Sequence, residues 1–258
     1  ALVHYRSDGF RGWLEHSAYT SDIDVVSGDM IDSDTVREAV RGCEMVFHLA
    51  ALVAIPYSYR APASYIRGNI EGTLTLLQAA LAAGVAKVVH TSTSEVYGSA
   101  RYVPMDENHS LSGQSPYSAS KIAADKIAEA FHLSYQLPVA TIRPFNTFGP
   151  RQSARAVVPT IITQALASPE IRLGSLTPTR DFTFVADTVE GFLRVAESPA
   201  AVGQVTNIGT GREISIGELA ELILKLAGRT GVPIVSDRQR LRPDASEVSR
   251  LCADATRA

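Results

Sequence analysis

Residues 87–98 read Lys-Val-Val-His-Thr-Ser-Thr-Ser-Glu-Val-Tyr-Gly, a short apolar run that ends in a polar segment. The run Lys87–Thr91 predicts a buried β-strand, so the polar segment lies at its carboxyl end. Outward from this stretch, short apolar runs alternate with helical patterns through the first half of the chain. This repeated strand-helix-strand order indicates an α/β fold with a doubly wound parallel sheet, whose ligands bind at the carboxyl ends of the strands.

The alternation ends after Pro144, and a mixed pattern of helices and short strands follows. We expect one domain over residues 1–145 and about 181–203, and a smaller lobe over about 146–180 and 204–258, at the carboxyl edge of the sheet. Ser33 is the expected cap of a helix at 33–41, and Gly84 the expected end of a helix at 69–83. The remaining expected strands are 1–5, 22–27, 45–49, 139–143, 171–173, 181–185 and 205–208, and the remaining helices are 117–135, 157–167, 186–197 and 216–226.

The bulk composition favours a soluble cytoplasmic enzyme. The chain has 258 residues, of which 45% are hydrophobic and 20% charged, and its net charge is −3 without a basic run. Nucleic acid and membrane surfaces are therefore not expected as partners. No apolar run reaches the roughly 18 residues that cross a bilayer. The two cysteines, Cys43 and Cys252, lack metal-ligand spacing, so we expect no metal site.

A dinucleotide-binding sheet normally opens with a strand, a Gly-rich turn and a helix that binds the pyrophosphate. Gly9 and Gly12 follow the first expected strand but open no helical pattern, so we expect a surface loop there. The chain starts inside a strand pattern and stops in a helical one. We therefore expect a fragment whose parent carries the first strand and the Gly-rich turn.

The segment 115–121, Ser-Pro-Tyr-Ser-Ala-Ser-Lys, places Tyr117 and Lys121 about one helical turn apart on one face. A lysine ammonium beside a phenol favours the phenolate, which is a useful base near neutral pH. This spacing alone is common by chance. Together with the strand-end motif at 91–98, it is much more specific.

These two segments and several others resemble the extended short-chain dehydrogenase/reductase family, in its NAD-dependent nucleotide-sugar epimerase/dehydratase branch. Within that branch the chain is most similar to 4,6-dehydratases of N-acetylated hexosamine nucleotides, including those of legionaminic-acid biosynthesis. The resemblance implies a Rossmann-type sheet with a nucleotide-sugar lobe. The motifs that carry it are Gly28-Asp29-Met30, His48-Leu49-Ala50-Ala51, Asn69 with Gly72-Thr73, residues 92–98, residues 117–121, residues 143–150, Arg180-Asp181-Phe182, Asn207-Ile208-Gly209 and Arg242-Pro243.

The resemblance implies a mechanism in which bound NAD stores a hydride. Tyr117 removes the proton of the sugar C4 hydroxyl, while Lys121 binds the nicotinamide ribose and favours ionisation of Tyr117. Thr93 binds the C4 oxygen. Glu95 then removes the C5 proton, the C6 hydroxyl leaves, and the product is a 4-keto-6-deoxy sugar nucleotide. A 4-epimerase needs no base for C5, so Glu95 favours a dehydratase.

Ser94 departs from the glucose-type dehydratases, which carry an aspartate there as the acid for the leaving hydroxyl. The GDP-mannose dehydratases and the UDP-glucuronate decarboxylases both have serine. The segment Thr93-Ser94-Glu95 therefore fits dehydration, with Glu95 or a water supplying the proton, and the resemblance implies a UDP- or GDP-N-acetylhexosamine as the substrate. A 4-epimerase and a UDP-glucuronate decarboxylase stay open as alternatives. A non-catalytic sugar-nucleotide-binding module is the alternative from another class.

The resemblance also implies the binding residues and a homodimer. Substrate contacts fall on Thr93, Asn146, Arg180 and Arg242, with Glu247 a further candidate. Arg6 follows the first expected strand, where it could meet a 2′-phosphate, so NADP stays open beside NAD. The dimer would form through the helices at 69–83 and 117–135. The expected cofactor contacts are Asp29, Met30, Leu49, Ala50, Ala51, Asn69, Ser92, Tyr117, Lys121 and Pro144.

Overall fold

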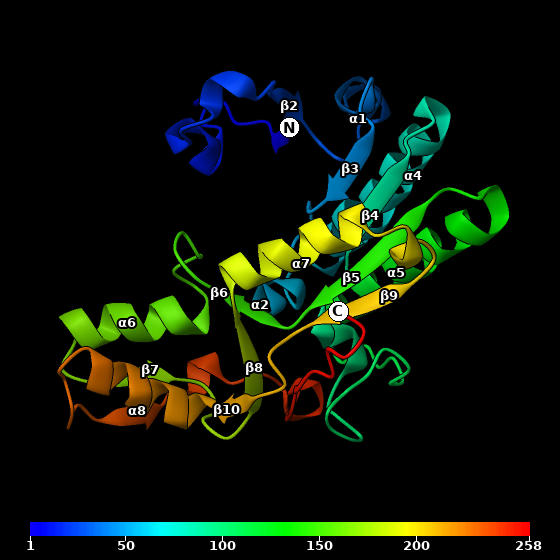
Figure 1. Ribbon diagram of the computed structural model, residues 1–258. Coiled ribbons are helices and arrows are strands. Elements are labelled where there is room, and N and C mark those ends of the chain that lie inside the picture. The colour runs from blue at the N-terminus through cyan, green and yellow to red at the C-terminus, as the bar shows by residue number, and fades with distance from the viewer. The chain divides into compact units, whose positions relative to one another are not determined.

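The computed structural model describes residues 1–258, and the chain forms two compact units (Figure 1). Unit 1 consists of Ala1–Ser92, Ser115–Ile142 and Phe192–Val205. Unit 2 consists of Thr93–Gln114, Arg143–Gly191 and Thr206–Ala258. The boundary between Ser92 and Thr93 falls inside the strand-end motif, so the motif contributes residues to both units.

Parallel strands form the centre of unit 1. The four-stranded sheet has the order β3-β4-β5-β9, where β3 is Met45–His48, β4 is Lys87–Thr91, β5 is Val139–Pro144 and β9 is Val205–Ile208. Strands β5 and β9 continue into unit 2. A separate parallel pair contains β1 (Leu2–His4) and β2 (Val26–Gly28). The expected parallel α/β arrangement is confirmed, and its strands are divided between these two sheets.

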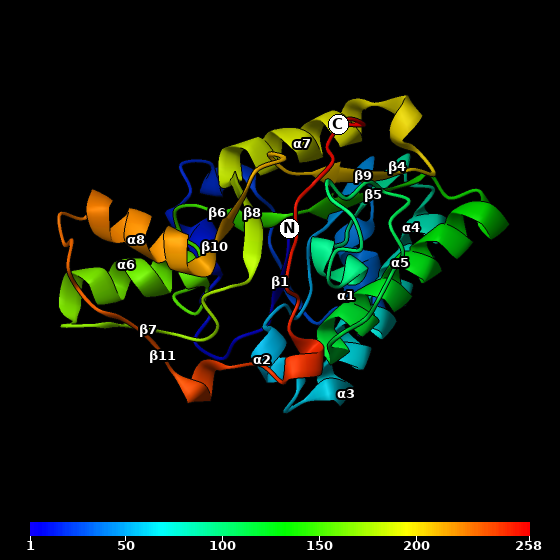
Figure 2. The same ribbon diagram turned by 90° about the horizontal axis from the view of Figure 1, so that it is seen from below.

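Helices cover both faces of the four-stranded sheet of unit 1, with α4 and α5 on one face and the end of α7 on the other (Figures 1 and 2). Lys87, at the start of β4, fixes the end of α7 because its ammonium donates to the carbonyls of Ala196 at 2.6 Å and Ser198 at 2.8 Å. The helices of this unit are α1 (Ser33–Val40), α2 (Ile55–Ser58), α3 (Pro62–Tyr65), α4 (Gly72–Ala83), α5 (Pro116–Tyr135), the C-terminal part of α7 (Val185–Glu197), the π-helix η3 (Ile66–Glu71) and the 3-10 helices η1 (Gly12–His16), η2 (Thr20–Asp22) and η5 (Pro199–Ala201).

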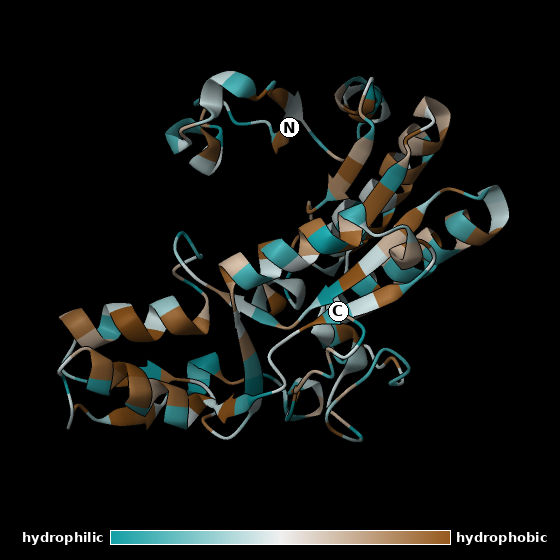
Figure 3. Ribbon diagram, in the orientation of Figure 1, coloured by the Kyte–Doolittle hydropathy of each residue, from teal (hydrophilic) through white to brown (hydrophobic).

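The core of unit 1 lies between the strands and the helices α1, α4 and α5. Its members are aliphatic, and the strands carry the brown colour of apolar residues in Figure 3. Burial of each valine or leucine side chain contributes about 1.5–3 kcal/mol. Leu2 of β1 and Val46 of β3 both pack against this core, so the two sheets share it. The buried members are Val36, Val40, Leu76, Leu77, Ala79, Ala80, Val85, Val88, Ala128, Leu137 and Val139.

Unit 2 combines two small sheets with helices α6 (Val157–Ala167) and α8 (Ile216–Leu226), which pack together. The first sheet has the order β10-β8-β6, and the second pairs β11 with β7 in parallel. Ile161, Ile171 and Leu219 lie in its core. The strands are β6 (Asn146–Phe148), β7 (Ile171–Leu173), β8 (Thr179–Phe184), β10 (Glu213–Ser215) and β11 (Ile234–Ser236), and the 3-10 helices are η4 (Ser94–Tyr97), η6 (Arg238–Arg240) and η7 (Asp244–Ser246).

The structure corrects several expected element ends. Asp32 caps α1 in place of Ser33, because its carboxylate accepts the backbone N–H of Asp34 at 3.1 Å. Helix α4 begins at Gly72 after a π-helical turn, and Gly84 ends it in the left-handed conformation as expected. The prediction of a helix at the end of the chain is wrong, since the last residues form a turn. None of the helices is both long and apolar enough to cross a membrane.

Candidate active site

The predicted site residues occur in both units, and each half is described within its own unit. In unit 1, Tyr117 and Lys121 lie on the first turns of α5. Ser115 caps this helix through a reciprocal capping box with Ser118, and Pro116 occupies the first turn, where its missing N–H costs nothing. The local sequence therefore fixes where the helix starts, and with it the face on which Tyr117 and Lys121 lie.

Tyr117 and Lys121 are both buried, with 7% and 3% of their surface exposed. The Tyr117 ring packs edge-on against Tyr65, with ring centroids 6.2 Å apart. The Lys121 ammonium donates to the backbone carbonyl of Thr91 at 2.5 Å. Burial lowers the pKa of Lys121 from 10.5 to about 8, and the charge of Asp125 opposes that shift. A proton on Lys121 can therefore be lost near neutral pH.

The segment that follows β3 is exposed and is held by Asn69. Leu49 and Ala50 are exposed and Ala51 is half-buried. The Asn69 side chain is buried and bonds both backbone groups of Leu52, accepting from its N–H at 2.8 Å and donating to its carbonyl at 3.0 Å. The Asn69 amide also donates to Ser120 on α5 at 2.9 Å. Asn69 therefore positions the segment 49–52 beside the helix of Tyr117.

Asp29 and Met30 follow the end of β2 and are half-buried. The Asp29 carboxylate accepts the backbone N–H of Ile31 at 3.2 Å, and His4 of β1 lies 3.7 Å from it. Met30 faces Gly72, where an added Cβ would lie 3.1 Å from the Met30 Cβ. A glycine at the start of α4 thus allows the close approach of Met30.

In unit 2, Thr93, Ser94 and Glu95 form the start of η4. The Thr93 hydroxyl oxygen caps this helix by accepting the Glu95 N–H at 3.3 Å, which leaves its O–H hydrogen free to donate. Ser94 and Glu95 are buried, with 2% and 8% of their surface exposed. Gly98 ends the helix at φ +66°, and an added Cβ there would lie 2.9 Å from the Ser112 carbonyl. The turn therefore holds Glu95 in a defined, largely dry position.

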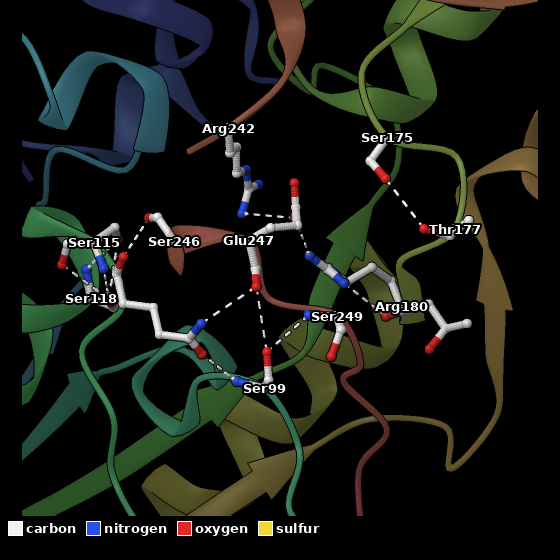
Figure 4. Close-up of polar contacts among 12 residues, drawn as sticks. Ser99, Ser115, Ser118, Ser175, Thr177, Arg180, Arg242, Ser246, Glu247 and Ser249 are labelled. Carbon is white, nitrogen blue, oxygen red and sulfur yellow. Dashed lines mark hydrogen bonds and ion pairs between the residues drawn. The ribbon is translucent and has the colours of Figure 1, made fainter. Parts of the chain in front are cut away.

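Two arginines of unit 2 share the carboxylate of Glu247, as Figure 4 shows. Arg180 lies 3.6 Å and Arg242 3.8 Å from its Oε1 atom, which are long ion pairs. Arg180 is only 5% exposed, and burial lowers the pKa of its guanidinium, while the charges of Glu95 and Glu247 oppose the shift. The two guanidinium groups outnumber the one carboxylate that they share, and guanidinium groups are suited to bind phosphate or carboxylate oxygens.

The remaining predicted residues of unit 2 are Pro144 and Asn146, and both are half-buried. Asn146 lies on β6, opposite Phe182 in the register with β8, two residues from Arg180. Its side-chain oxygen is buried and has no hydrogen-bond partner within the protein. An oriented polar atom without a partner is typical of a binding position, because leaving such an atom unbonded costs free energy.

The sequence interpretation missed two buried polar residues of unit 1, His90 and Asp125, and it named Ser92 only as a cofactor contact. In unit 1, Ser92 donates to Asp125 at 2.7 Å, and His90 lies 3.0 Å from the same carboxylate. Their spacing in the sequence could have indicated these contacts. His90 and Ser92 are two residues apart, so they lie on one face of an extended segment, and Asp125 lies one helical turn after Lys121. Nowhere in the chain does a group of three His, Cys, Asp or Glu side chains gather as metal ligands would.

A parallel sheet with buried Tyr and Lys one turn apart, preceded by a polar strand end, is typical of the short-chain dehydrogenases/reductases. The family model of GDP-mannose 4,6 dehydratase matches residues 2–258 of this chain. The chain therefore belongs to this family, whose members are nucleotide-sugar-modifying dehydratases and epimerases. The expected placement in the NAD-dependent epimerase/dehydratase branch is confirmed.

Known proteins of both activities are similar to this chain. The UDP-glucose 4-epimerase of Mycolicibacterium smegmatis is 37% identical over 94% of this chain and 78% of its own length. The dTDP-glucose 4,6-dehydratase DesIV of Streptomyces venezuelae, solved with NAD bound, has a TM-score of 0.83 and 30% identity over 92% of this chain and 73% of its own. The UDP-N-acetylglucosamine 4-epimerase of Methanobrevibacter ruminantium, solved with UDP-N-acetylmuramic acid, has a TM-score of 0.86 and 27% identity over 99% of this chain and 82% of its own.

Proposed function

We propose that this protein is an NAD-dependent 4,6-dehydratase that converts a UDP- or GDP-N-acetylhexosamine into a 4-keto-6-deoxy sugar nucleotide. The observation that carries the proposal is the buried carboxylate of Glu95, two residues after Thr93 in the strand-end motif. The charge of Arg180 acts on this carboxylate and offsets part of its desolvation cost, so its place in the motif, together with its burial, supports a role in proton transfer. A dehydratase needs such a base for C5, whereas a 4-epimerase does not.

In the first step Tyr117, as phenolate, takes the proton of the C4 hydroxyl while C4 is oxidised. Lys121 supports the phenolate, because an ammonium on the same helix face favours the anionic form of the phenol. Thr93 donates its free O–H hydrogen to the C4 oxygen, since the hydroxyl oxygen is already an acceptor for the Glu95 N–H. NAD, when bound, would supply the hydride acceptor for C4 and the hydride donor for C6.

In the second step Glu95 takes the C5 proton, which the neighbouring 4-ketone acidifies. The pair of electrons forms the C5–C6 double bond, and the C6 hydroxyl leaves with a proton as water. Ser94 is buried beside Glu95 but is a poor acid, so we assign the proton transfer to Glu95 itself or a bound water. A hydride at C6 and a proton at C5 complete the product, and the proton that Tyr117 took from the C4 hydroxyl balances the proton gained at C5.

The residues of the chain fit an NAD site. Leu49, Ala50 and Ala51 form an exposed segment with two small side chains after β3, where a dinucleotide backbone can approach closely. Asp29, at the end of β2, offers a carboxylate to a hydroxyl or amino group, and Met30 lies next to it. We propose that these residues, with Tyr117, Lys121 and Pro144, hold the cofactor. Asn69 and Ser92 instead position other parts of unit 1, since the Asn69 side chain bonds the backbone of Leu52 and the Ser92 hydroxyl bonds Asp125.

The substrate contacts proposed for unit 2 follow from charge and from hydrogen bonding. Arg180 and Arg242 each have an ion pair longer than 3.5 Å, so a diphosphate oxygen can offer them a shorter, charge-assisted bond. Asn146 has a buried oxygen atom without a partner, which a sugar or nucleotide donor can satisfy. Glu247 accepts from ribose hydroxyls or the base in this arrangement, and Thr93 completes the set at C4.

A 4-epimerase is the second candidate, because two of the similar proteins named above are 4-epimerases. The two candidates differ in the mass of the product. The protein, supplied with NAD and UDP- or GDP-N-acetylglucosamine, is expected to yield a product lighter by one water molecule. A product of unchanged mass with inverted C4 would overturn the dehydratase in favour of the epimerase. Release of carbon dioxide from a UDP-glucuronate would identify a decarboxylase.

We also propose that two copies of the chain pair through α4 and α5. Ala119 is exposed and Ala123 half-buried on α5, and small residues allow helices to approach closely. A shallow apolar depression of about 240 Å³ lies beside Ala119, lined by Ile66 and Ile70 among others. Light scattering of the native protein should give twice the chain mass, and Ala119→Arg should give the single-chain mass. A single-chain mass for the unmodified protein would contradict the dimer.

A further inference from the structure

Asp125 lies inside unit 1 in a network that the proposed reaction does not use. It follows Lys121 by one turn of α5 and is only 5% exposed. One carboxylate oxygen lies 3.0 Å from His90 Nε2, and the other accepts the Ser92 hydroxyl at 2.7 Å. Thr91, between these two residues, accepts the Lys121 ammonium through its carbonyl. Residues 90–92 therefore contact both charged side chains of α5: His90 and Ser92 contact Asp125, and Thr91 contacts Lys121.

A buried ammonium needs compensation, because burial favours the neutral amine. Burial is the largest influence on Lys121 and lowers its pKa to about 8, and the charge of Asp125 is the influence that raises it. The charged and titratable groups on the neighbouring elements of unit 1 are Arg67 and Glu71 on η3, Tyr65 on α3, His48 on β3, Lys87 and His90 on β4, Tyr57 on α2, Tyr59 and Arg60 after α2, and Tyr117, Lys126 and Glu129 on α5.

Both carboxylate oxygens of Asp125 are bonded. Its Oδ2 accepts the Ser92 hydroxyl, and its Oδ1 lies 3.0 Å from His90 Nε2, which donates when that nitrogen carries a proton. Hydrogen bonds donated to a carboxylate favour its charged form. The neighbouring His48 is not a competing cation, since burial and the charges of His90 and Lys121 lower its pKa well below the usual value. His48 instead lies 2.9 Å from the Thr73 hydroxyl and packs beside the His90 ring, its partner in the register of β3 and β4.

We propose that the Asp125 carboxylate is the counter-ion that keeps Lys121 protonated, and that His90 and Ser92 hold it in place. Asp125 is then a positioning residue for the Tyr117–Lys121 pair, and this role rests on the proposed function. Without its negative charge, Lys121 becomes a neutral amine at a lower pH. A neutral amine no longer supports the Tyr117 phenolate, so the catalytic base is lost as well.

The test is the titration of Lys121 in the whole protein without substrate, followed by carbon-13 NMR of its ε-methylene group and assigned with Lys121→Arg. Asp125→Asn keeps the shape and removes the charge, and its amide can accept from one neighbour and donate to the other, because the Ser92 hydroxyl can act as donor or acceptor. We expect it to lower the midpoint by about one to two pH units, the effect of one nearby opposite charge. Asp125→Glu, which retains the charge, should restore the midpoint. Asp125→Ser is a second neutral variant if Asp125→Asn fails to fold.

The matched control is Glu129→Gln, one turn further along α5, where the carboxylate is exposed and paired with Lys126 at 2.6 Å. It removes the same formal charge and should leave the midpoint unchanged. An equal midpoint in Asp125→Asn and the unmodified protein would overturn the inference, even where dehydration is measured. A shift of equal size in Glu129→Gln would also overturn it, since net charge would then explain the effect.

A second readout is the alkaline limb of the kcat/KM profile, which should move to lower pH in Asp125→Asn by the same amount as the NMR midpoint. A merely structural role would lower kcat/KM at every pH without moving this limb, and that result would overturn the inference. Absence of dehydration in the unmodified protein would overturn the proposed function instead. The NMR midpoint alone would then decide whether Asp125 is the counter-ion of Lys121.

Discussion

The polar side chains around Lys121 in unit 1 and those around Arg180 in unit 2 are held in different ways. In unit 1, Asn69 and Asp125 each have two or more short hydrogen bonds inside the fold, and Lys121 has one to Thr91. In unit 2, Arg180 and Arg242 share one carboxylate at 3.6 and 3.8 Å, and the Asn146 oxygen has no partner. We infer that unit 1 is organised before any ligand binds, whereas unit 2 has bonding capacity that a ligand can use.

The largest effect that this comparison predicts follows Tyr117→Phe, which removes the base from the organised half. We expect kcat to fall about 10³-fold, within the usual range for a general base. The dissociation constant for the nucleotide sugar should change little, because the proposed phosphate contacts lie in unit 2. Steady-state kinetics and calorimetry measure the two quantities separately. Tyr65→Phe, whose ring packs on Tyr117, is the matched control, and a fall of equal size there would contradict the assignment.

The next largest effect is on binding of the nucleotide sugar and follows changes to the arginines of unit 2. Arg180→Met and Arg242→Met should each raise KM about tenfold or more, because a charge-assisted hydrogen bond is worth roughly 1.5–3 kcal/mol. We expect kcat of Arg242→Met to stay within a few-fold, since the loss falls equally on substrate and transition state, whereas Arg180→Met also removes a charge that acts on Glu95. Arg212→Met, which changes an exposed arginine of the same unit, is the control. A loss confined to kcat would mean that the arginines act on the chemistry.

A smaller effect is the pH dependence set by Lys121. Its ammonium is lost as the pH rises through about 8, so kcat/KM should fall about tenfold per pH unit above that value. The contribution of Lys121 to the free energy of unfolding should instead increase with pH. Between about 8 and 10.5 the unfolded chain holds the lysine proton more tightly than the folded one, so this group makes the free energy of unfolding rise with pH. A kcat/KM that stays constant up to pH 10 would contradict the role of the ammonium.

The smallest effect on catalysis is expected for Lys87→Met. Lys87 is buried at the start of β4 and bonds the carbonyls at the end of α7. Its loss leaves those carbonyls without their donor, which should lower the free energy of unfolding by about 1–3 kcal/mol. Urea unfolding measures this, and kinetics under stable conditions should be unchanged. A large change in KM with unchanged stability would refute the purely structural role of Lys87.

Much of unit 1 was predictable because its local signals agree with one another. Strand β4 was expected at 87–91 and observed there, and Gly84 ends α4 as expected. The Tyr117–Lys121 face follows from helical spacing alone. The cap of α1 was misjudged by one residue because Asp32 and Ser33 are both good caps, and the carboxylate of Asp32 reaches the N–H of Asp34.

The unit 2 cluster was less predictable, because its contacts join residues far apart in the chain. Arg180, Arg242 and Glu247 were each named from the sequence, but nothing in their spacing indicates that the two arginines share one carboxylate. Strands β6, β10 and β11 have three residues each, too few to show an alternating pattern. The contact between Asp125 and His90 was not predictable for the same reason, because it joins a helix residue to a strand residue 35 positions away in the chain.

The central claim is dehydration with Glu95 as the base for C5. The most direct test is mass spectrometry of the products that the protein and its Glu95→Gln variant form from UDP- or GDP-N-acetylglucosamine with NAD, with Glu221→Gln as the control for an exposed carboxylate of unit 2. We predict a product lighter by one water molecule with the unmodified protein and the control, and its loss with Glu95→Gln. An epimer of unchanged mass, or a dehydrated product that persists in Glu95→Gln, would contradict this account.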